Sequence, residues 1–551
     1  MAWPAGRTAS LYYRYPHYAS PRAAELDGAR LRHKVAVVGA GPVGLACALG
    51  LARHGVASVV LEARTTVGEG SRAICLARHS FETFQQLGIC APFLAKALPW
   101  THGTSYYRER PVYRLEMSHS EDERFYPMYN LQQQYIEEYL VAAAAASPLI
   151  ELRWGHALDA LQMAGDDVRL AVSSPAGSYA VQTQYVVAAD GARSRVRQQL
   201  GLRLAGDAHP GRYVIVDIRL RSTYPTERRA FFDPPANPGG TVLVHKQPDD
   251  IWRIDYQLRD DEDETAALAE EAIRARVGTI VAMLGEHAPW ELEWWSLYKA
   301  YTLCLDDYRH GPVLFAGDAA HLVPIFGVRG LNSGFADAAD LGWKLAFVAS
   351  GRADDALLDS YTPERRGATL DIFAQAGRST RFMTPPTRGE RRVREAVLSL
   401  AAQHPAARRL LDPRQSLPYT YAASPLSTRD ESAPESAAGV RVGAALPNAR
   451  LGDDEFLLDH LGREFTLLVF GDRALSAGST HDCVAAAAAR GVALHVLTLP
   501  TAGRAAQRCG TTAGGALLVR PDRHLCARWT TVTPAACERA LARALALKGG
   551  T

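Results

Sequence analysis

The strongest pattern near the N-terminus is a short apolar run, a glycine-rich turn and a long stretch rich in Ala and Leu. The run VAVV at residues 35–38 is typical of a strand that is buried on both faces. A second run, SVVLE at residues 58–62, follows the Ala/Leu-rich stretch. Strand, helix and strand in this order make a right-handed crossover, so the pattern predicts a parallel α/β sheet of the Rossmann-like kind.

Two later apolar runs predict further strands of the same sheet, whereas much of the sequence between them alternates polar and apolar residues. The runs are residues 185–191 and 313–318. Residues from about 206 to 299 alternate polar and apolar side chains, which predicts an antiparallel sheet inserted into the first domain. The stretch from about 335 to 410 has few turn residues and is expected to be helical.

Changes in composition divide the rest of the chain. Residues 1–32 are aromatic, basic and aperiodic, which predicts an arm ahead of the first domain. The stretch 426–439 is rich in Pro, Ser and Glu and is typical of a linker. It separates a domain at 33–425 from a second α/β domain at 440–551, as expected for 551 residues when one domain rarely exceeds about 250.

Charge and composition exclude several classes of protein. A formal net charge of +2 gives no basis for binding nucleic acid or an anionic membrane. Apolar runs of transmembrane length and the apolar core of a signal peptide are both missing, so a cytoplasmic protein is expected. The eight cysteines contain no Cys-x-x-Cys pair and lack the spacing of a zinc site or disulfide framework, which predicts reduced thiols and no metal.

The glycine turn after the first strand is the first feature that indicates a ligand. Gly39, Gly41 and Gly44 fit G-x-G-x-x-G between a strand and a helix, the turn that holds the pyrophosphate of a dinucleotide. The free N–H groups at the start of the helix attract the phosphates. Glu62 ends the second strand, where its carboxylate can accept hydrogen bonds from a ribose. These residues predict a dinucleotide site and leave NAD and FAD both open.

Two carboxylates at later turns add to this picture. Asp190 follows the third predicted strand in an Ala-Asp-Gly sequence, and Asp318 follows the fourth in Gly-Asp-Ala-Ala-His. Asp318 is suited to hold ribityl hydroxyls, and the helix that starts near Asn332 can present N–H groups to a flavin ring. Taken alone, Asp190 also fits an Asp-Gly turn and Asp318 also fits a helix cap.

In this order, the three motifs resemble those of the flavin-dependent aromatic hydroxylases of the para-hydroxybenzoate hydroxylase fold, over residues 33–375. The resemblance implies FAD, with Glu62 at the adenosine ribose, Asp318 at the ribityl chain and Asp190 between FAD and the nicotinamide donor. It also implies an FAD contact from Gln133, for which the adjacent Gln132 and Gln134 are alternatives. The other positions that it assigns to the cofactor are Gly39, Gly41, Pro42, Gly44, Arg72, Gly330, Leu331 and Asn332.

The chain departs from the family pattern after the Asp318 motif. Ile325 replaces the usual second proline, and Arg329 stands where many members have glycine. Arg329 is similar to the branch that includes 3-(3-hydroxyphenyl)propionate hydroxylases and would add positive charge near the flavin, although it also fits a surface arginine. Pro324, Arg72 and Arg329 are the catalytic candidates that the resemblance implies. His321 is interpreted as a structural histidine and not as a metal ligand.

The resemblance also implies the reaction. NADH or NADPH reduces FAD, O₂ adds at flavin C4a, and the hydroperoxide gives one oxygen to a phenolic ring, as in a hydroxyphenylpropionate-like compound. A polyketide-tailoring hydroxylase or epoxidase is the alternative among enzymes, and a non-catalytic flavin-binding assembly protein is the alternative outside them. On the inserted sheet, His245, Arg253 and Tyr256 are candidate substrate contacts, although the sequence does not establish which face each strand turns to the substrate.

The C-terminal region resembles the thioredoxin-like appendage of larger members of this group, with residues 508–522 as the match. A working thioredoxin needs a Cys-x-x-Cys at a helix N-terminus, which the sequence lacks. The resemblance therefore implies a structural role, including support of a homodimer.

Overall fold

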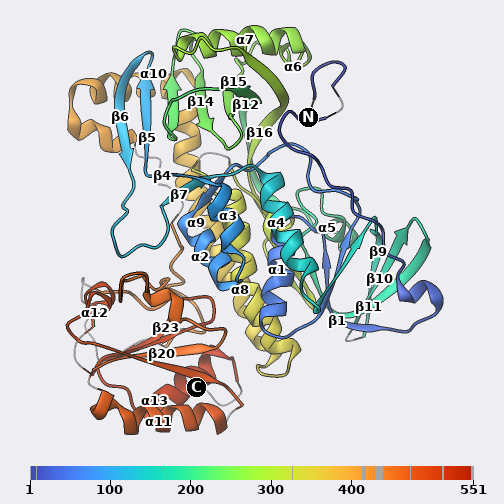
Figure 1. Ribbon diagram of the computed structural model, residues 1–551, viewed down its shortest axis with the longest axis vertical. Coiled ribbons are helices and arrows are strands. Elements are labelled where there is room, and N and C mark those ends of the chain that lie inside the picture. Colours follow the sequence, from blue (N-terminus) through green and yellow to red (C-terminus); the bar gives the residue numbers. More distant parts are fainter. Residues whose placement is uncertain are drawn as a thin grey trace.

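The computed structural model describes residues 2–7, 9–165, 167–324, 327–411, 417–428, 439–471, 473–489, 491–511 and 514–547. Figure 1 shows the antiparallel sheet with α6 and α7 at the top, the parallel sheet and its helices in the middle, and the C-terminal unit below. This arrangement confirms the predicted mixed α/β fold with an inserted sheet.

The parallel sheet has the strand order β17-β18-β11-β1-β2-β8. Its central strand β1 pairs in parallel with both β11 and β2, and both later runs join this sheet, as the sequence predicts. The first half of β11 pairs instead with β10, which pairs with β9, and this side sheet was not predicted. The bounds are β1 Arg32–Val38, β2 Ser58–Glu62, β8 Ile150–Trp154, β9 Ala157–Ala164, β10 Asp167–Ser174, β11 Gly177–Ala188, β17 Arg309–His310 and β18 Val313–Phe315.

Helices α1, α4 and α8 pack around this sheet. Helices α1 and α8 approach closely at Gly50 and Gly342. A Cβ on Gly50 would lie only 3.3 Å from the Cα of Gly342, so glycine at this position allows the close packing. A small sheet, β3-β7-β4, and helices α2 and α3 fill the space beside them. The bounds are α1 Pro42–Arg53, α2 Arg78–Gln86, α3 Cys90–Lys96, α4 Gln133–Ala145, α8 Gly330–Ala349, β3 Cys75–Ala77, β4 Leu98–Trp100 and β7 Met128–Asn130.

The inserted sheet has the order β19-β16-β12-β15-β14-β13-β5-β6 and extends beyond the predicted 206–299 range. Strands β5 and β6 come from residues 102–116, and β5 pairs in parallel with β13, a long-range pairing that a local pattern does not reveal. Helices α6 and α7 cover the outer face (Figure 1). The bounds are β5 His102–Tyr107, β6 Arg110–Glu116, β12 Ala205–Leu220, β13 Arg228–Phe232, β14 Thr241–Lys246, β15 Ile251–Gln257, β16 Trp290–Cys304, β19 His321–Leu322, α6 Glu264–Ala267 and α7 Glu270–Met283.

The predicted helical stretch is divided into separate helices. Helix α8 begins five residues before the predicted start, and a 3-10 segment, η3 Asp355–Ser360, separates it from α9 Tyr361–Met383. Helix α10, Arg388–Gln403, follows a break at residues 384–387. Among the described residues, no helix is both long and apolar enough to cross a membrane.

The N-terminal arm is packed against the body of the molecule and contains the short helix η1 Ala24–Asp27. Tyr18 stacks on Trp154 of β8 with ring centroids 4.3 Å apart. The N–H of Gly70 donates to the hydroxyl of Tyr15 at 3.1 Å, and the arm also pairs with β16 through Ala2. Its aromatic composition therefore serves packing between the two sheets.

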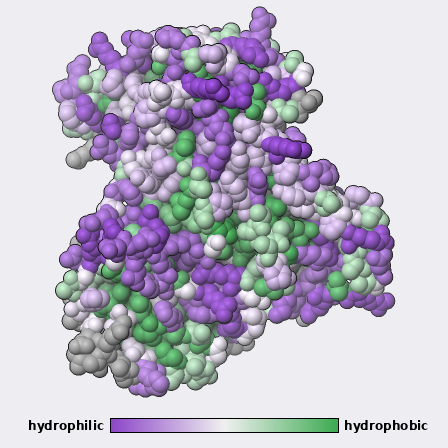
Figure 2. Space-filling view, viewed as in Figure 1, coloured by the Kyte–Doolittle hydropathy of each residue, from purple (hydrophilic) through white to green (hydrophobic). Residues whose placement is uncertain are grey.

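Figure 2 shows that polar and apolar residues gather over different layers of the molecule. Polar residues cover most of the region of α6 and α7, whereas apolar residues gather over the Ala-rich helices α1 and α4 in the middle of the molecule. These helices carry apolar side chains on more than one face, since alanine is tolerated at both buried and exposed helix positions.

The C-terminal unit is a sheet of order β21-β20-β22-β23 with helices α11, α12 and α13. Strands β20 and β21 are parallel and the other pairs antiparallel, a topology compatible with the predicted thioredoxin-like domain. Most of the predicted linker, residues 429–438, lies outside the described residues. The bounds are β20 Phe465–Phe470, β21 Leu494–Leu499, β22 Ala516–Val519, β23 Leu525–Trp529, α11 Arg473–Ala489, α12 Arg504–Cys509 and α13 Pro534–Ala544.

A buried ion network joins the C-terminal unit to α8 and α9. Arg520, which follows β22, binds Glu364 of α9 at 2.7 Å and Asp340 of α8 at 2.9 Å, and it also pairs with Asp522. Lys344 of α8 binds the same Glu364 and Asp340 at 2.6 and 2.9 Å. These side chains are at most 1% exposed, so the contact between the two units depends on charges that are removed from water.

Candidate active site

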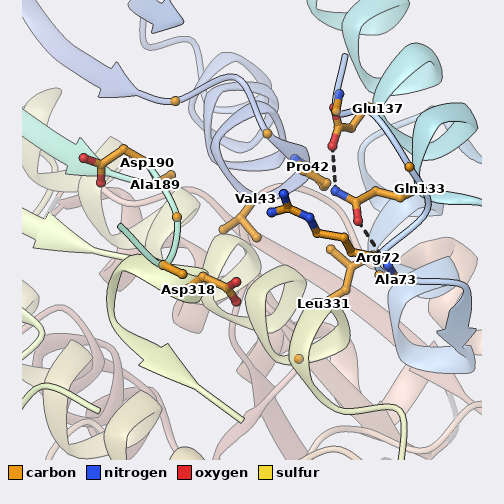
Figure 3. A pocket seen from close by; sticks show the side chains of 18 of the residues that line it. Pro42, Val43, Arg72, Ala73, Gln133, Glu137, Ala189, Asp190, Asp318 and Leu331 are labelled. Atoms are coloured by element: carbon orange, nitrogen blue, oxygen red, sulfur yellow. Dashed lines mark hydrogen bonds between the residues drawn. The ribbon is translucent and has the colours of Figure 1, made fainter. Parts of the chain in front are cut away.

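A cavity of about 710 Å³ lies between the carboxyl ends of the parallel strands and the inner face of the inserted sheet. This is the place where ligands bind in open α/β sheets. Its wall contains residues from the glycine turn, the loop after β2, the start of α4, the two aspartate turns, the start of α8, and strands β13 to β15. Figure 3 shows part of this wall.

The glycine turn forms one end of the cavity as the sequence predicts. Gly41 is the N-cap of α1 and lines the cavity, and a Cβ on it would meet no protein atom within 4 Å. A Cβ on Gly44, by contrast, would overlap the carbonyl oxygen of Gly39. The turn therefore leaves room for a ligand at Gly41 and none for a side chain at Gly44.

Glu62 lines the cavity and also stabilises the glycine turn. The N–H of Ala40 donates to its Oε2 at 2.8 Å, and Arg64 donates to Oε1 from both its backbone N–H and its Nε, at 3.0 and 2.9 Å. A carboxylate has further lone pairs, so Glu62 can accept from a ribose while it holds the turn.

The two aspartates lie on neighbouring turns at the same edge of the sheet (Figure 3). Asp318 lies in a 3-10 turn, Gly317–Ala319, three residues beyond β18, and not in the strand itself. Its side chain is open to the cavity, and burial in the protein raises its pKa while the charges of His321, Arg72 and Arg197 lower it. Asp190 accepts from the N–H of Val196 at 3.0 Å through Oδ2.

The other oxygen of Asp190, Oδ1, is buried without a partner among the described residues. Burying an acceptor without a donor costs free energy, because the oxygen loses its hydrogen bonds to water and forms no others in their place. Burial also raises the pKa of this carboxyl, against the hydrogen bonds from Ser194 and Val196. Asp190 thus retains one acceptor for a ligand at the cavity wall.

His321 supports the Asp318 turn and does so through Asp337 of α8. Its Nε2 lies 2.7 Å from Asp337, which also accepts from the N–H of Gly317 at 3.0 Å and from Arg365 Nε at 2.7 Å. The histidine is fully buried in this pairing, as its interpretation as a structural residue requires.

The structure distinguishes Gln133 from its neighbours. Gln133 lines the cavity, accepts from the N–H of Ala73 at 3.1 Å and donates to Glu137 at 2.7 Å (Figure 3). Gln132 and Gln134 turn away, to the carbonyl of Pro248 and to the hydroxyl of Tyr12. Gln133 is therefore the glutamine in position to contact a cofactor.

Hydrogen bonds join the loop after β2 to the start of α4. Glu137 accepts from the N–H of Gly68, and burial raises its pKa. Sequence reasoning missed Glu137, although it lies one helical turn after Gln133 and so on the same face of α4. Arg72, in the same loop, extends its side chain into the cavity (Figure 3).

The start of α8 reaches the cavity, and the side chain of one of its residues is already hydrogen-bonded within the protein. Gly330, Leu331 and Asn332 all line the wall. The amide of Asn332 is already occupied: its oxygen accepts from the N–H of Ala77 at 2.8 Å and from Ser80 at 2.7 Å, and its nitrogen donates to two carbonyls. Its side chain secures the helix start, so only its backbone is free to face a cofactor.

Two of the predicted residues before α8, Pro324 and Arg329, line the cavity. Pro324 lines the cavity, whereas Ile325 lies outside the described residues. Arg329 also lines it and is only 4% exposed, which is incompatible with a surface arginine. Burial lowers its pKa and the charge of Asp371 raises it.

The inserted sheet closes the cavity, and its register decides which candidates face it. Arg253 lines the wall, whereas Tyr256 lies on the opposite face of β15, among the side chains that pack on α7. The guanidinium of Arg276 lies 5.4 Å from its ring centroid. Because successive strand residues point to opposite faces, Arg253 and Tyr256 cannot both contact one ligand, and the prediction of Tyr256 is wrong.

Arg253 and His245 line the cavity, but Arg253 is already hydrogen-bonded within the protein and the pKa of His245 is lowered. Arg253 binds Asp217 at 2.8 and 3.0 Å and donates to the carbonyls of Ser71 and Arg72, so it braces the loop that carries Arg72. Burial and the charges of Arg228 and Arg253 lower the pKa of His245 to about 3, which makes this ring neutral at physiological pH. The same face presents Arg228 of β13 and Asp255 of β15, which sequence reasoning missed although Asp255 shares the alternation of Arg253.

Comparison with known proteins identifies the family. The FAD binding domain family matches residues 32–376. This chain belongs to that family. The 3-(3-hydroxy-phenyl)propionate/3-hydroxycinnamic acid hydroxylase of Mycobacterium sp. (strain JLS) is 30% identical over 84% of this chain and 81% of its own length. The 12-dehydrotetracycline 5-monooxygenase/anhydrotetracycline 6-monooxygenase of Streptomyces rimosus is 30% identical over 91% of this chain and 95% of its own.

Solved structures agree with this assignment. The flavin-dependent monooxygenase PieE, in complex with FAD and substrate, has the same fold, with a TM-score of 0.78 at 24% identity over 94% of this chain and 99% of its own. Aklavinone-11 hydroxylase with FAD and aklavinone has a TM-score of 0.74 at 25% identity over 93% of this chain and 99% of its own.

The wall of the cavity fits FAD, the cofactor of the family. The open space at Gly41 faces the N-terminus of α1, where phosphates are favoured. The orphaned oxygen of Asp190 and the carboxylate of Asp318 are acceptors for hydroxyl groups, and the start of α8 presents helix N–H groups. These donors and acceptors match a dinucleotide with a ribityl chain.

Replacing Asp318 by alanine is expected to weaken FAD binding by about 10- to 100-fold, because hydrogen bonds to a charged group each contribute about 1.5–3 kcal/mol. Titration of apoprotein with FAD, followed by flavin fluorescence, measures the change. Asp306→Ala is the matched control, since Asp306 is exposed and pairs only at the surface with Arg366. Equal FAD affinity in Asp318→Ala and wild type would contradict the assignment of Asp318.

Proposed function

We propose that this FAD-binding chain is an NAD(P)H-dependent monooxygenase that hydroxylates a phenolic ring, with a hydroxyphenylpropionate-like compound as the substrate. The observation that carries the proposal is the continuous cavity, which joins the dinucleotide end at Gly41 to a polar sheet face at Arg228, His245 and Asp255. A cavity of this size can hold a flavin and a ring beside it. The names of the relatives, which are hydroxylases and monooxygenases, support it.

FAD, when bound, supplies the electron transfer and the O₂ chemistry. The residues of this chain position the reactants. The glycine turn and the N-terminus of α1 bind the pyrophosphate, and Asp318 and Asp190 hold hydroxyl groups. Pro324, ahead of α8, and Leu331, in its first turn, are apolar residues of the wall, and together with the sheet they exclude water from the place of reaction.

The positive charges near the start of α8 have a separate part in the proposal. Arg72 extends into the cavity, and Arg329 is buried in its wall. Together with the helix N-terminus they stabilise negative charge on the ring system that they face. The nicotinamide donor is expected to bind transiently near Asp190, since the sequence contains one glycine turn of the dinucleotide type.

A polyketide-tailoring hydroxylase is the second candidate, and one observation favours it. The tetracycline monooxygenase of Streptomyces rimosus matches this chain over 95% of its own length, more than the 81% of the Mycobacterium hydroxylase. The two candidates share the flavin site and differ in the size of the ring system that reaches the inserted sheet.

The deciding experiment is a substrate screen with the FAD-loaded protein. Phenolic acids, simple phenols and polycyclic aromatic polyketides are each tested for stimulation of NADH and NADPH oxidation and for an oxygenated product. We expect one phenol to raise NAD(P)H oxidation with a matching amount of hydroxylated product. A protein that carries FAD but forms product from none of these compounds would be a flavin-binding assembly protein instead.

We also propose that the protein acts in the cytoplasm. Its eight cysteines are all free, and most are buried, as suits a reducing compartment. The support of a homodimer by the C-terminal unit stays a prediction.

A further inference from the structure

Two opposite charges face the cavity from the inserted sheet without a partner. Asp255 on β15 is 6% exposed, and its Oδ1 is buried without a hydrogen bond. Arg228 on β13 is 8% exposed. Both line the cavity, and within the described part of the chain neither forms a hydrogen bond or ion pair, with each other or with another residue.

The register of the sheet explains why Asp255 stays unpaired. Its neighbours across the strands are Leu243 on β14 and Ile215 on β12, which offer no donor. Arg253, two residues earlier on the same face, is bound by Asp217. Asp255 therefore keeps both oxygens for a ligand.

Arg228 is unpaired for a similar reason. It lies opposite His245 on β14, and His245 lies opposite Arg253 on β15. A histidine carries no negative charge in either protonation state, so the ring of His245, neutral at its lowered pKa of about 3, does not neutralise Arg228. Arg228 is thus a buried cation without a hydrogen-bond or ion-pair partner among the described residues.

Buried charges without partners are costly, by several kcal/mol each in general, so a pair of them facing one cavity indicates a ligand that satisfies both. Such a ligand donates a hydrogen bond to Asp255 and offers an oxygen to Arg228. A phenolic hydroxyl meets both needs, because it has a proton to give and becomes an anion when it gives it.

We propose that Asp255 is the catalytic residue that takes the proton from the substrate's phenolic hydroxyl, and that Arg228 stabilises the phenolate. The proposal rests on the proposed function. In this step the O–H bond of the phenol breaks, the proton passes to a carboxylate oxygen of Asp255, and the electron pair stays on the phenol oxygen. The negative charge moves from Asp255 to the ligand beside Arg228, and the ring becomes richer in electrons.

The charges around Asp255 suit a base that works near neutral pH. Burial raises the pKa of Asp255 to about 7, and Asp217 on β12 adds to the rise, whereas Arg253 on β15 and Arg228 on β13 oppose it. Neutral His245 lines the same cavity from β14, opposite Arg253. Because only the ionised form accepts a proton, phenolate formation is expected to increase with pH through about 7 and to fail below it.

The test compares FAD-loaded wild type, Asp255→Asn and Asp255→Glu, with 3-nitrophenol as an optical probe, because its phenolate absorbs visible light. At about pH 7.5 the free probe is mostly un-ionised, like other weakly acidic phenols. Difference spectra against the holoprotein are expected to show bound phenolate in wild type and Asp255→Glu. In Asp255→Asn we expect at least about a tenfold smaller phenolate fraction. Asp250→Asn, in the turn before β15, is the matched control and is expected to behave as wild type.

Turnover of the best phenol from the substrate screen gives a second readout. Loss of a general base is expected to lower kcat/KM of Asp255→Asn by about 10²- to 10⁴-fold at neutral pH. Activity should recover as the pH approaches the pKa of the phenol itself, and acidic phenols should lose less than weakly acidic ones. A merely structural role of Asp255 predicts neither the recovery nor the dependence on the phenol.

The outcomes separate the two proposals. If the bound probe is a phenolate in Asp255→Asn as in wild type, or if wild type binds it only as the neutral phenol or not at all, the role of Asp255 is overturned. Hydroxylated product from wild type in the same series would leave the proposed function intact. An absence of product from every compound would overturn the proposed function itself.

Discussion

Replacing Gly44 by alanine is expected to weaken FAD binding by about 100-fold or more and to lower the stability of the apoprotein. A Cβ at this position would overlap the carbonyl oxygen of Gly39 and lie 3.3 Å from the Cβ of Ala189. The overlap is with backbone, so no rotation of a side chain can relieve it, and α1 must move away from the turn. Overpacking of this kind costs about 1–3 kcal/mol and sometimes more. FAD titration and urea unfolding of the apoprotein measure the two effects.

Gly41→Ala is the informative comparison for this variant. Its Cβ would meet no protein atom within 4 Å and would project into the cavity, and its backbone φ of −72° suits alanine. We therefore expect wild-type stability of the apoprotein together with weakened FAD binding, since the pyrophosphate approaches the backbone at this glycine. If Gly44→Ala binds FAD like wild type, the close packing of α1 on the turn is not what shapes the site.

Replacing Arg520 by methionine is expected to destabilise the protein by about 3–5 kcal/mol. The change removes the guanidinium from the buried carboxylates Glu364 and Asp522, whose pKa values it lowers, and the cost is that of these charges without their partner. Chemical unfolding, followed separately by FAD release and by far-ultraviolet circular dichroism, tests whether α8 and the C-terminal unit come apart together. Arg504→Met is the control, because Arg504 pairs with Glu121 at an exposed surface and should change stability by less than about 1 kcal/mol.

The pH dependence of the Arg520 variant has a defined sign. Burial raises the pKa of Glu364 and of Asp522, but the charge of Arg520 and its neighbours lowers both more strongly, so that the net direction is downward. A carboxyl with a lowered pKa in the folded state stabilises the protein above its ordinary pKa and loses this effect as the pH falls. The difference between wild type and Arg520→Met should therefore be largest near neutral pH and shrink below about pH 4. A difference that grows toward acid would contradict the role of these ion pairs.

Local sequence patterns predicted the parts of the fold that are continuous in the chain. The β1-α1-β2 unit and its glycine turn follow from apolar runs and glycine spacing within about thirty residues. The positions of Asp190 and Asp318 after strands placed both at one edge of the sheet, where the structure has them. Strands β5 and β6 were missed because they join the inserted sheet by pairing with a strand more than a hundred residues later.

The substrate end of the site shows the limit of such patterns. Alternation predicted that β15 is a strand, but the covering of one face by α7 decides that Arg253 and Asp255 point to the cavity and Tyr256 away from it. In the same way, the sequence contains Asn332 at the start of α8 without showing that Ala77, Ser80 and two carbonyls occupy its amide. These outcomes depend on partners that are remote in the chain.

The sequence by itself determined the glycine turn between β1 and α1, the order of the aspartate motifs and the α/β class, because each depends on backbone conformation or on neighbours within one strand and turn. Only the tertiary structure decided that Gln133 and not its neighbours faces the cavity, that Arg253 is neutralised by Asp217, and that Asp255 and Arg228 have no partner within the described part of the chain. The physical reason is that burial and pairing of a charge depend on every element packed around it, and strand register assembles those elements from distant parts of the chain.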